Sequence, residues 1–405
     1  MTRDPSNPEP PRQPKSNAIE VLQSLLVAFV LAMTFRGFVA EGFVIPTGSM
    51  APTLMGRHLL IHTPQTGWTY RVGLDTNRSR QAIAQRARNL ADPMLGPNMH
   101  GSGRPIGQSK PRMGDRILVL KTIYPFAQPE RYDVVVFKNP TDPNGKSANY
   151  IKRLIGLPNE TVWLADGDVF AKADDKESFE IKRKPEHVQR AVWQTVYHSD
   201  YVPLDPVSLT PRHPGPPWVG ENWNTDDTRA YRCDTADPTT LEWSLFRRQI
   251  NDWLAYNQLK REPEQFPVSD VRVKAAVVPD QDGLQTTFEL RSRGHVFTFS
   301  LGDHRATVRM RPENESQPAK TESVPMQSLP GGRVFDVEFW HVDQRLAIYF
   351  NDEQVVELKY DWRPEQRLRQ ATGVMQPQSD DWKTARPKQS TLQWHFEGSP
   401  VTLHR

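Results

Sequence analysis

Cysteine is almost absent from this chain. Cys233 is the single cysteine among 405 residues, which excludes an internal disulfide framework and a cysteine-rich zinc ribbon. The folded parts must therefore be stabilised by packing, even if most of the chain lies outside the cytoplasm. No internal repeat of fixed period is evident in the sequence either.

The chain also lacks a large excess of charge. It carries 51 Lys and Arg against 48 Asp and Glu, a formal net charge of +3. Dense basic patches with interleaved aromatic residues are missing, so we expect no nucleic-acid partner. Hydrophobic residues make up 37% and aromatic residues 9% of the chain, which is enough to build ordinary cores. The length predicts two or three domains.

Long apolar runs are limited to one, at residues 19–40, which read "IEVLQSLLVAFVLAMTFRGFVA". About 20 such residues cross a bilayer, so we predict a transmembrane helix. A cleaved secretory signal is the alternative, but no convincing small-x-small cleavage site follows. Arg3, Arg12 and Lys15 precede the run, which favours a cytoplasmic N-terminus. We therefore expect a single-pass membrane protein, with a disordered cytoplasmic tail at 1–18 and the rest of the chain on the outer side.

Strand patterns dominate the sequence after the apolar run, so the predicted fold class is mainly β. Runs rich in Val and Ile and bounded by Pro, Gly and Asp predict a β domain over 41–171. A loop insertion at 63–112 interrupts it, with a short helix expected at 79–90. The runs that carry this prediction lie at 114–124, 131–140 and 149–171.

The second half of the chain divides into two further regions. Residues 172–267 are predicted to be a mixed Pro-rich and helical connector, with apolar residues at helical spacing over 239–260. Residues 268–405 alternate like a β-sandwich of jelly-roll or lectin-like pattern. Four tryptophans are candidates for a binding face, although burial is the commoner outcome for tryptophan: Trp193, Trp218, Trp223 and Trp243.

The stretch "EGFVIPTGSMAPTL" at 41–54 places Ser49 in a small turn between prolines. A serine needs a base within hydrogen-bond reach to act as a nucleophile. In "NYIKRLIGL", β alternation puts Lys152 on one face with Tyr150 and Leu154. Burial among apolar neighbours lowers the pKa of a lysine, and a fall of three units costs about 4 kcal/mol. The ordinary alternatives are a turn serine and a strand lysine with its amine in water.

The order of the motifs resembles the bacterial type I signal peptidases (leader peptidases), a family of Ser/Lys proteases. The boxes that carry the resemblance are "IPTGSMAPTL" at 45–54, "GDRILVLK" at 114–121 and "RYDVVVFKNP…NYIKRLIGLPNETV" at 131–162. With the preceding membrane helix, they are far more specific than a lone serine. The resemblance implies a serine endopeptidase of the cytoplasmic (inner) membrane that cleaves signal peptides from exported preproteins. It also implies that 41–171 is a signal-peptidase-type β catalytic domain on the outer, periplasmic side.

The resemblance also implies roles for individual residues. Ser49 matches the nucleophile and Lys152 the general base. Thr47 stands where the family has a serine that assists the oxyanion hole, Arg153 matches the residue beside the base, and Tyr150 lies two positions before the base. Asp115 and Asp133 are expected to hold strand ends in place.

The resemblance further implies shallow apolar pockets for small substrate side chains. We expect Phe43, Val44, Ile45 and Met50 to line them. No metal or other cofactor is implied. The expected partners are the signal peptides of preproteins, the lipid bilayer and the protein export machinery nearby.

Two departures from the family pattern stand out. The last box of the family, Gly-Asp-Asn-x-x-x-Ser-x-Asp-Ser-Arg, is not found, and "LGDHRATVRM" at 301–310 shares only its Gly-Asp-x-Arg. Either that box lies beyond residue 405, which we favour, or the chain is a divergent paralogue. The family's Gly-Asp after "GLP" is replaced by Asn159 and Glu160.

Two rival functions stay open from sequence alone. A self-cleaving, repressor-type Ser/Lys enzyme would need a DNA-binding module, for which the N-terminal tail is too short. A catalytically weak or inactive, membrane-tethered paralogue would bind a glycan or a protein partner through the C-terminal sandwich. That sandwich is otherwise a structural insertion.

Overall fold

The computed structural model describes residues 18–74, 90–95, 110–142, 149–203, 205, 215–225, 229–259, 265–314, 317–374 and 385–404. The expected disordered tail, apart from Ala18, and the short helix predicted over 79–90, apart from Leu90, lie outside these residues. The described residues are mainly β, which confirms the predicted fold class. They divide into two units, one with residues of 1–44 and 116–129 and one with residues of 45–115 and 130–405.

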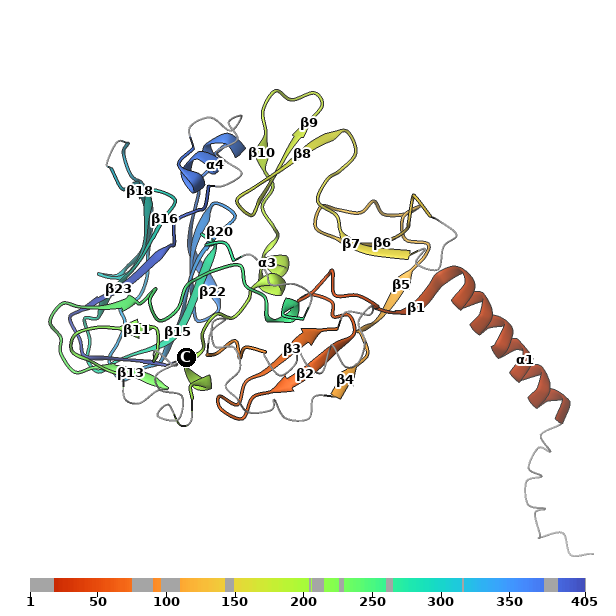
Figure 1. The fold of residues 1–405 in the computed structure, drawn as a ribbon, viewed down its shortest axis with the longest axis horizontal. Helices are drawn as coiled ribbons and strands as arrows, with labels where there is room; N and C mark the ends of the chain where they lie inside the picture. The colour runs from red at the N-terminus through yellow and green to blue at the C-terminus, as the bar shows by residue number, and fades with distance from the viewer. Residues whose placement is uncertain are drawn as a thin grey trace, which may run out of the picture. The chain divides into compact units, whose positions relative to one another are not determined.

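The first unit is the apolar helix with a two-stranded β ladder. α1 (Ala18–Thr34), drawn in red in Figure 1, continues through a π-helical turn η1 (Phe35–Val39) into β1 (Ala40–Val44), which pairs antiparallel with β5 (Arg116–Leu120). By length and composition, the 22 residues Ala18–Val39 are long and apolar enough to cross a membrane, although a signal sequence has the same properties. The predicted apolar helix is therefore present.

Three small antiparallel sheets form the first part of the second unit. They follow the Val-rich and Ile-rich runs of the sequence, because alternating side chains suit a half-covered pleated surface. Their orders are β3-β2-β4, β6-β7 and β10-β9-β8. Their bounds are β2 (His58–His62), β3 (Thr69–Gly73), β4 (Lys110–Arg112), β6 (Val134–Lys138), β7 (Asn149–Arg153), β8 (Glu160–Ala165), β9 (Asp168–Ala173) and β10 (Glu180–Ile181). The short helices α3 (Glu186–Val192) and η2 (Ser199–Tyr201) follow.

The remainder of the second unit is a β-sandwich of two seven-stranded sheets. The first sheet runs β11 (Trp218–Val219), β14 (Thr239–Trp243), β23 (Thr391–Glu397), β16 (Gln285–Ser292), β17 (His295–Gly302), β18 (Arg305–Pro312), β19 (Lys320–Pro325). The second runs β12 (Trp223–Asn224), β13 (Ala230–Cys233), β24 (Val401–His404), β15 (Val271–Pro279), β20 (Phe335–Val342), β21 (Arg345–Phe350), β22 (Glu353–Lys359). A helix, α4 (Pro364–Thr372), follows β22.

The two sheets bury an aromatic core between them. Phe288 of β16 stacks on Phe339 of β20 with ring centroids 5.3 Å apart, and Trp394 meets both rings edge-on. Each such side chain contributes about 1.5–3 kcal/mol by leaving water. Trp218, Trp223 and Trp243 belong to this core as well. They are therefore not available as an exposed binding face, while Trp193 packs edge-on against Trp340.

The prediction of a helix over 239–260 is wrong. The first residues of this segment form β14, in which Leu241 and Trp243 are buried and Glu242 is exposed. This alternation is the period of a strand and not that of a helix. Its end holds a short 3-10 turn, η4 (Ala255–Asn257). The sandwich sheets thus take four strands, β11 to β14, from the segment expected to be a connector.

Candidate active site

The segment that carries Ser49 is a compact turn between β1 and β2. The backbone N–H of Ala51 donates to the carbonyl of Gly48 at 3.1 Å, and that of Leu54 donates to Met50 at 2.9 Å. These two bonds fold the chain back on itself on either side of Ser49. The side chain of Ser49 is consequently presented to solvent.

Asp115 holds both ends of this turn. Its carbonyl accepts from the N–H of Ile45 at 2.9 Å, and its N–H donates to the carbonyl of Met55 at 2.8 Å. Its carboxylate oxygen Oδ2 accepts from the N–H of Met55 at 2.7 Å. A side chain on the preceding Gly114 would overlap the carbonyl of Ile45. The Gly-Asp pair therefore closes the base of the Ser49 turn.

Lys152 comes to Ser49 from a strand that lies 103 residues further along the chain. It is the fourth residue of β7 and pairs with Val135 of β6. Its Nζ lies 2.7 Å from the Ser49 Oγ and 3.1 Å from the carbonyl oxygen of its neighbour Ile151. The same Nζ lies 5.8 Å from the centre of the Tyr150 ring. The two residues expected to carry the chemistry are thus in direct hydrogen-bond contact.

The expected burial of Lys152 is not observed. Lys152 and Ser49 are both exposed. The alternation was right in placing Tyr150 on the face of Lys152, but that face is open, since Tyr150 and its edge-on neighbour Phe137 each remain 39% exposed. Burial of Lys152 among apolar neighbours is therefore wrong as a prediction for the described part of the chain.

Arg153 points to the opposite face of β7 and joins the strand to the Ser49 turn. Its Nη1 donates to the carbonyl of Tyr132 at 2.8 Å, and its Nη2 donates to Thr53 Oγ1 at 3.0 Å. The neighbouring Asp133 accepts from the N–H of Leu154 through its carbonyl at 2.9 Å. Thr53 was not predicted as a supporting residue. Its place in the serine box at 45–54 is the signal from which this role could have been predicted.

The remaining expected site residues divide between the two units. Thr47 is exposed on the turn, two residues before Ser49. Ile45 and Met50 are buried, at 2% and 8% exposure, and so do not line an open pocket. Phe43 and Val44 belong to β1 in the first unit, where Val44 is exposed.

The departure from the family pattern at Glu160 has a structural partner. Both carboxylate oxygens of Glu160 accept from Arg131 Nη2, at 2.8 and 2.7 Å, and one accepts from the N–H of Leu157 at 2.9 Å. The hydrogen bond from Arg131 is the largest cause that lowers the pKa of Glu160. Glu160 thus fixes the start of β8 to the segment before β6.

In the described part of the chain, no side chain beside Lys152 stands for the serine of the family's missing last box. There the amine of Lys152 contacts the Ser49 hydroxyl, the Ile151 carbonyl and the Tyr150 ring. The only similar stretch, 301–310, runs from β17 into β18 inside the sandwich.

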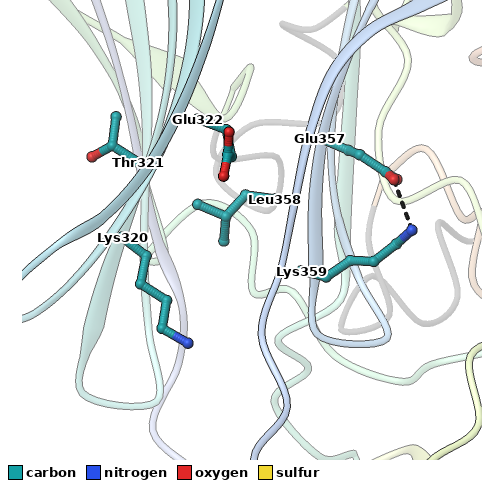
Figure 2. A pocket seen from close by; sticks show the side chains of 6 residues that line it. All are labelled: Lys320, Thr321, Glu322, Glu357, Leu358 and Lys359. Atoms are coloured by element: carbon teal, nitrogen blue, oxygen red, sulfur yellow. Dashed lines mark hydrogen bonds and ion pairs between the residues drawn. The ribbon is translucent and has the colours of Figure 1, made fainter.

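Two hollows lie on the sandwich, and neither is lined by Ser49 or Lys152. Figure 2 shows one of about 450 Å³ between β19 and β22, where Glu357 and Lys359 form an ion pair at 2.7 Å. Leu358 is its one apolar lining residue. The other, of about 410 Å³, is lined mainly by Thr, Ser, Gln and His side chains over β14, β23, β16, β17 and β18.

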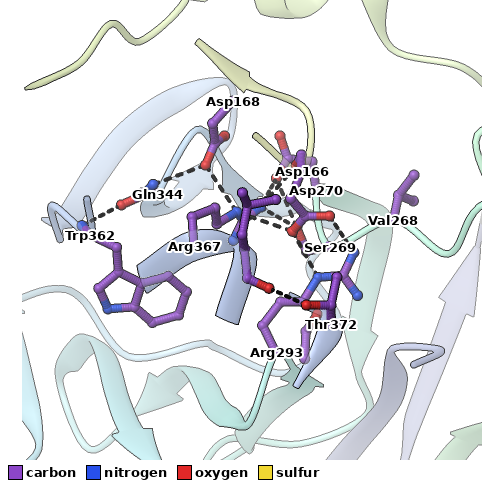
Figure 3. A network of polar contacts seen from close by, with 12 residues as sticks. Asp166, Asp168, Val268, Ser269, Asp270, Arg293, Gln344, Trp362, Arg367 and Thr372 are labelled. Carbon is purple, nitrogen blue, oxygen red and sulfur yellow. Dashed lines mark hydrogen bonds and ion pairs between the residues drawn. The ribbon is translucent and has the colours of Figure 1, made fainter. Parts of the chain in front are cut away.

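A buried network of charges binds the β8–β9 hairpin to the sandwich (Figure 3). Asp166, in the hairpin turn, makes a two-pronged ion pair with Arg293 at 2.8 and 2.9 Å. Asp168 lies 3.1 Å from Arg367 Nε and accepts from Gln344 at 2.9 Å. These contacts join strands of the small sheets to turns of the sandwich.

Three carboxylates of this network, those of Asp168, Asp270 and Asp343, lie within 4.8 Å of one another, close enough in principle to hold a metal ion. Their surroundings favour a different reading. Arg367 and Lys184 already pair with the carboxylates of Asp168 and Asp343. These carboxylates therefore belong to an ion-pair network between the β8–β9 hairpin and the sandwich.

A hydroxyl and an amine in hydrogen-bond contact are the two groups of a Ser-Lys site, one of the variants of the catalytic triad. Part of the chain also matches a family of peptidases. Residues 108–207, which include Lys152 but not Ser49, match the family model "Signal peptidase, peptidase S26".

Curated relatives point to the same family. The chain is similar to signal peptidase I of Pseudomonas aeruginosa (29% identical over 146 residues, 36% of this chain and 34% of that protein). It is also similar to a probable signal peptidase I-2 of a Synechocystis species (27% over 161 residues, 39% and 47%) and to signal peptidase I of Leptolyngbya laminosa (27% over 182 residues, 43% and 61%). The predicted resemblance to type I signal peptidases is confirmed, and the chain spans less than two thirds of the length of these relatives.

Solved structures resemble the chain only remotely. Sheep galectin-11 in complex with glycerol gives a TM-score of 0.22 at 9% identity, over 36% of this chain and 97% of that one. The carbohydrate-binding module CBM66 from Bacillus subtilis gives 0.27 at 10% identity, over 47% and 94%. Likenesses at this level say nothing about a ligand.

Proposed function

We propose that this protein is a membrane-anchored serine endopeptidase that removes signal peptides from exported preproteins. The observation that carries the proposal is the 2.7 Å contact between Ser49 Oγ and Lys152 Nζ. The similarity to signal peptidases I supports it, since it spans the box that contains Lys152. The alternative of an inactive binding protein is not favoured, because both groups of the dyad are present and in contact.

The chemistry follows from the two groups. The amine of Lys152 takes the proton of Ser49 Oγ, which attacks the carbonyl carbon of the scissile bond. The backbone N–H of Ser49 and the hydroxyl of Thr47 stabilise the oxyanion that forms. Lys152 then gives the proton to the leaving amine. The acyl group stays on Ser49 until Lys152 activates a water molecule that releases it.

Because Lys152 is exposed, we propose that the bound substrate removes water from its amine. Only an uncharged amine can accept the serine proton, and removal of water favours the uncharged form. A peptide lying over the exposed Ser49 and Lys152 would exclude that water. In this mechanism, Ser49 and Lys152 lose their water when the enzyme–substrate complex forms.

The apolar helix gives the proposed substrate its location. α1 and η1 would cross the cytoplasmic membrane once, with the preceding basic residues in the cytoplasm and the dyad on the periplasmic side. Residues 37–48 span at most about 40 Å of extended chain, so covalent connection alone keeps Ser49 near the bilayer. Preproteins delivered by the export machinery carry their own apolar segment in the same membrane.

A cleavage assay on the full chain in lipid vesicles tests the proposal. The wild type is expected to shorten a preprotein at its signal-peptide junction, while Ser49→Ala and Lys152→Ala are expected to give no product. Ser323→Ala and Lys320→Ala, both on β19 of the sandwich, are matched controls expected to cleave normally. Equal cleavage by the wild type and both dyad variants would falsify the assignment.

A further inference from the structure

The ring of Tyr256 lies directly against the backbone that presents Ser49. Tyr256 is 2% exposed and sits in the 3-10 turn η4. A methyl group built on Gly48, the residue before Ser49, would overlap this ring, and so would one built on Gly73 at the end of β3. The ring thus fills the space between β3 and the Ser49 turn, and both glycines are needed for its close approach.

The position of the ring is fixed by its neighbours in the chain. The Gln258 amide accepts from the N–H of Ala91 at 2.7 Å and donates to the carbonyl of Ala91 at 3.0 Å. Leu259 is buried in one cluster with Leu59 and Val72 of the β2–β3 sheet. A ring held by packing and by a two-way amide bond cannot move without disturbing that cluster.

The opposite side of the Ser49 turn is equally confined. A side chain on Gly56 would overlap the peptide that joins Thr47 to Gly48. The backbone just before Ser49 is therefore enclosed between Gly56 and the Tyr256 ring. Burial raises the pKa of Tyr256, so its hydroxyl stays neutral at physiological pH and is not a candidate general base.

Tyr256 comes from a part of the chain that the family model does not match. The matched residues are 108–207, whereas Tyr256 follows β14 of one sandwich sheet and precedes β15 of the other. The same connection holds Arg248, whose guanidinium donates to the carbonyl of Pro93 at 2.9 Å. The connection between β14 and β15 thus contacts the part of the unit that precedes the sandwich, and its Tyr256 ring lies against the Ser49 turn.

We propose that Tyr256 is a positioning residue for Ser49, through which the sandwich sets the geometry of the Ser49–Lys152 pair. The chemical role of that pair rests on the function proposed above, but its geometry does not. Displacement of a reacting group by about 1 Å costs roughly 100-fold in rate. A ring that prevents the turn from relaxing towards β3 is therefore expected to affect the chemical step rather than substrate binding.

The first experiment compares Tyr256→Ala with Tyr256→Phe in preprotein cleavage. Tyr256→Ala is expected to lower kcat by about 100-fold with little change in KM, and Tyr256→Phe, which keeps the ring, to retain most of the wild-type kcat. Tyr231→Ala, in β13 of the sandwich, controls for loss of a buried tyrosine and is expected to lower thermal stability without the loss of kcat. Equal kcat in Tyr256→Ala and Tyr231→Ala overturns the proposal.

The second experiment approaches the ring from its other side. Gly73→Ala is expected to push the ring towards Gly48 and to lower kcat, although Gly73 itself lies in β3 away from the dyad. If the ring transmits this effect, adding Gly73→Ala to Tyr256→Ala lowers kcat no further. Additive losses in the double variant would show that Gly73 acts without the ring and would overturn the proposal.

The third experiment does not depend on protease activity. Cys233 is buried, so in the Ser49→Cys chain the accessible thiol is the one beside Lys152. An adjacent ammonium lowers the pKa of a thiol, and the pH profile of alkylation by iodoacetamide measures it. Adding Lys152→Ala to the Ser49→Cys chain gives the profile of a thiol with no lysine beside it. Adding Tyr256→Ala instead is expected to move the profile of the Ser49→Cys chain towards that one. Adding Tyr256→Phe is expected to leave the profile of the Ser49→Cys chain unchanged.

The outcomes separate the two proposals. A profile that Lys152→Ala shifts and Tyr256→Ala leaves unchanged overturns the positioning role, whatever the protein cleaves. A profile that responds to Tyr256→Ala, in a chain that cleaves no preprotein, supports the positioning role and contradicts the proposed function. Circular dichroism of each variant confirms that the comparison is made between folded chains.

Discussion

Arg153 connects the two halves of the candidate site at the scale of a single residue. It follows Lys152 in β7 and reaches back to Thr53 in the Ser49 turn at 3.0 Å, while its second nitrogen is held by the carbonyl of Tyr132 at 2.8 Å. The planar fork of an arginine makes both bonds at once, which a lysine cannot reproduce. Arg153 therefore connects the strand that carries Lys152 to the turn that carries Ser49.

Arg153→Lys is expected to lower kcat for preprotein cleavage by about 10- to 100-fold, since a hydrogen bond to a charged group contributes roughly 1.5–3 kcal/mol. Thr53→Val, which keeps the shape and removes the hydroxyl, is expected to act in the same direction, and the double variant to be no worse than Arg153→Lys alone. Steady-state kinetics in vesicles measure this. Unchanged kcat in both single variants would contradict the role of this contact.

Which residues would meet was predictable at this scale, and their environment was not. Ser49 and Lys152 are in hydrogen-bond contact, as the serine and lysine boxes suggested, whereas the contact of Arg153 with Thr53 was not predicted. The alternation of β7 also placed Lys152 with Tyr150 correctly, but a period of two cannot say whether the face it defines is covered. Tyr256 could not be assigned to the site at all, because its contact with Gly48 comes from packing between distant segments.

The joint between the β6–β7 ladder and the β8–β9 hairpin contains one of the two departures from the family pattern, at Asn159 and Glu160. Glu160 opens β8 and pairs with Arg131, and both side chains are nearly buried, at 13% and 12% exposure. Arg131 also donates to the carbonyl of Ile155. One ion pair thus fixes the chain that leaves β7 relative to the chain that enters β6.

Glu160→Gln is expected to reduce the free energy of unfolding by about 1.5–3 kcal/mol at neutral pH, because it weakens a charged hydrogen bond that is partly shielded from water. Since the pKa of Glu160 is lowered, this contribution is present above the pKa of an unfolded glutamate and disappears as the pH falls through the lower folded value. Urea unfolding at several pH values measures it. The exposed Glu177→Gln is the matched control, and a loss of equal size there would contradict this account.

Short elements were harder to predict than long ones. The long sandwich strands follow their alternation, as in β16, where buried and less buried residues alternate. The segment 239–260 was misread because its leucines fit a helical period, whereas β14 is only five residues long and is stabilised by pairing with β23. Sheet pairing between distant strands is a tertiary effect that a local pattern does not contain.

The buried charge network joins the β8–β9 hairpin to the sandwich and contains carboxyl groups whose pKa is raised. Four carboxylates, of Asp166, Asp168, Asp270 and Asp343, face three cations, of Arg293, Arg367 and Lys184. Desolvation raises the pKa of Asp270 to about 7, reinforced by the nearby carboxylates of Asp168 and Asp343. The excess negative charge is therefore balanced by a proton below neutral pH.

This proton gives a signed expectation for stability. A carboxyl whose folded pKa is raised contributes stability below its unfolded pKa, and this is lost as the pH rises through the folded value. The contribution of Asp270 is therefore expected to fall between about pH 4 and pH 8. In Asp270→Asn, which holds a neutral group at every pH, this part of the pH dependence disappears.

Thermal unfolding of the wild type and Asp270→Asn across this range measures the effect. The midpoint temperature of unfolding of Asp270→Asn is expected to rise relative to that of the wild type as the pH rises. Asp282→Asn changes an exposed carboxylate, and this control should follow the wild-type curve. Parallel curves for the wild type and Asp270→Asn would contradict the role of the network.

The most direct test of the central claim is the mass of the acyl-enzyme. The full chain in vesicles is mixed with a preprotein, quenched in acid within a turnover and digested with trypsin, which releases residues 37–57 as one peptide. The account predicts that this peptide carries the signal-peptide acyl group on Ser49, and that Lys152→Ala abolishes the adduct. Preprotein cleavage that proceeds with no adduct on Ser49, or that persists in Ser49→Ala, would contradict it.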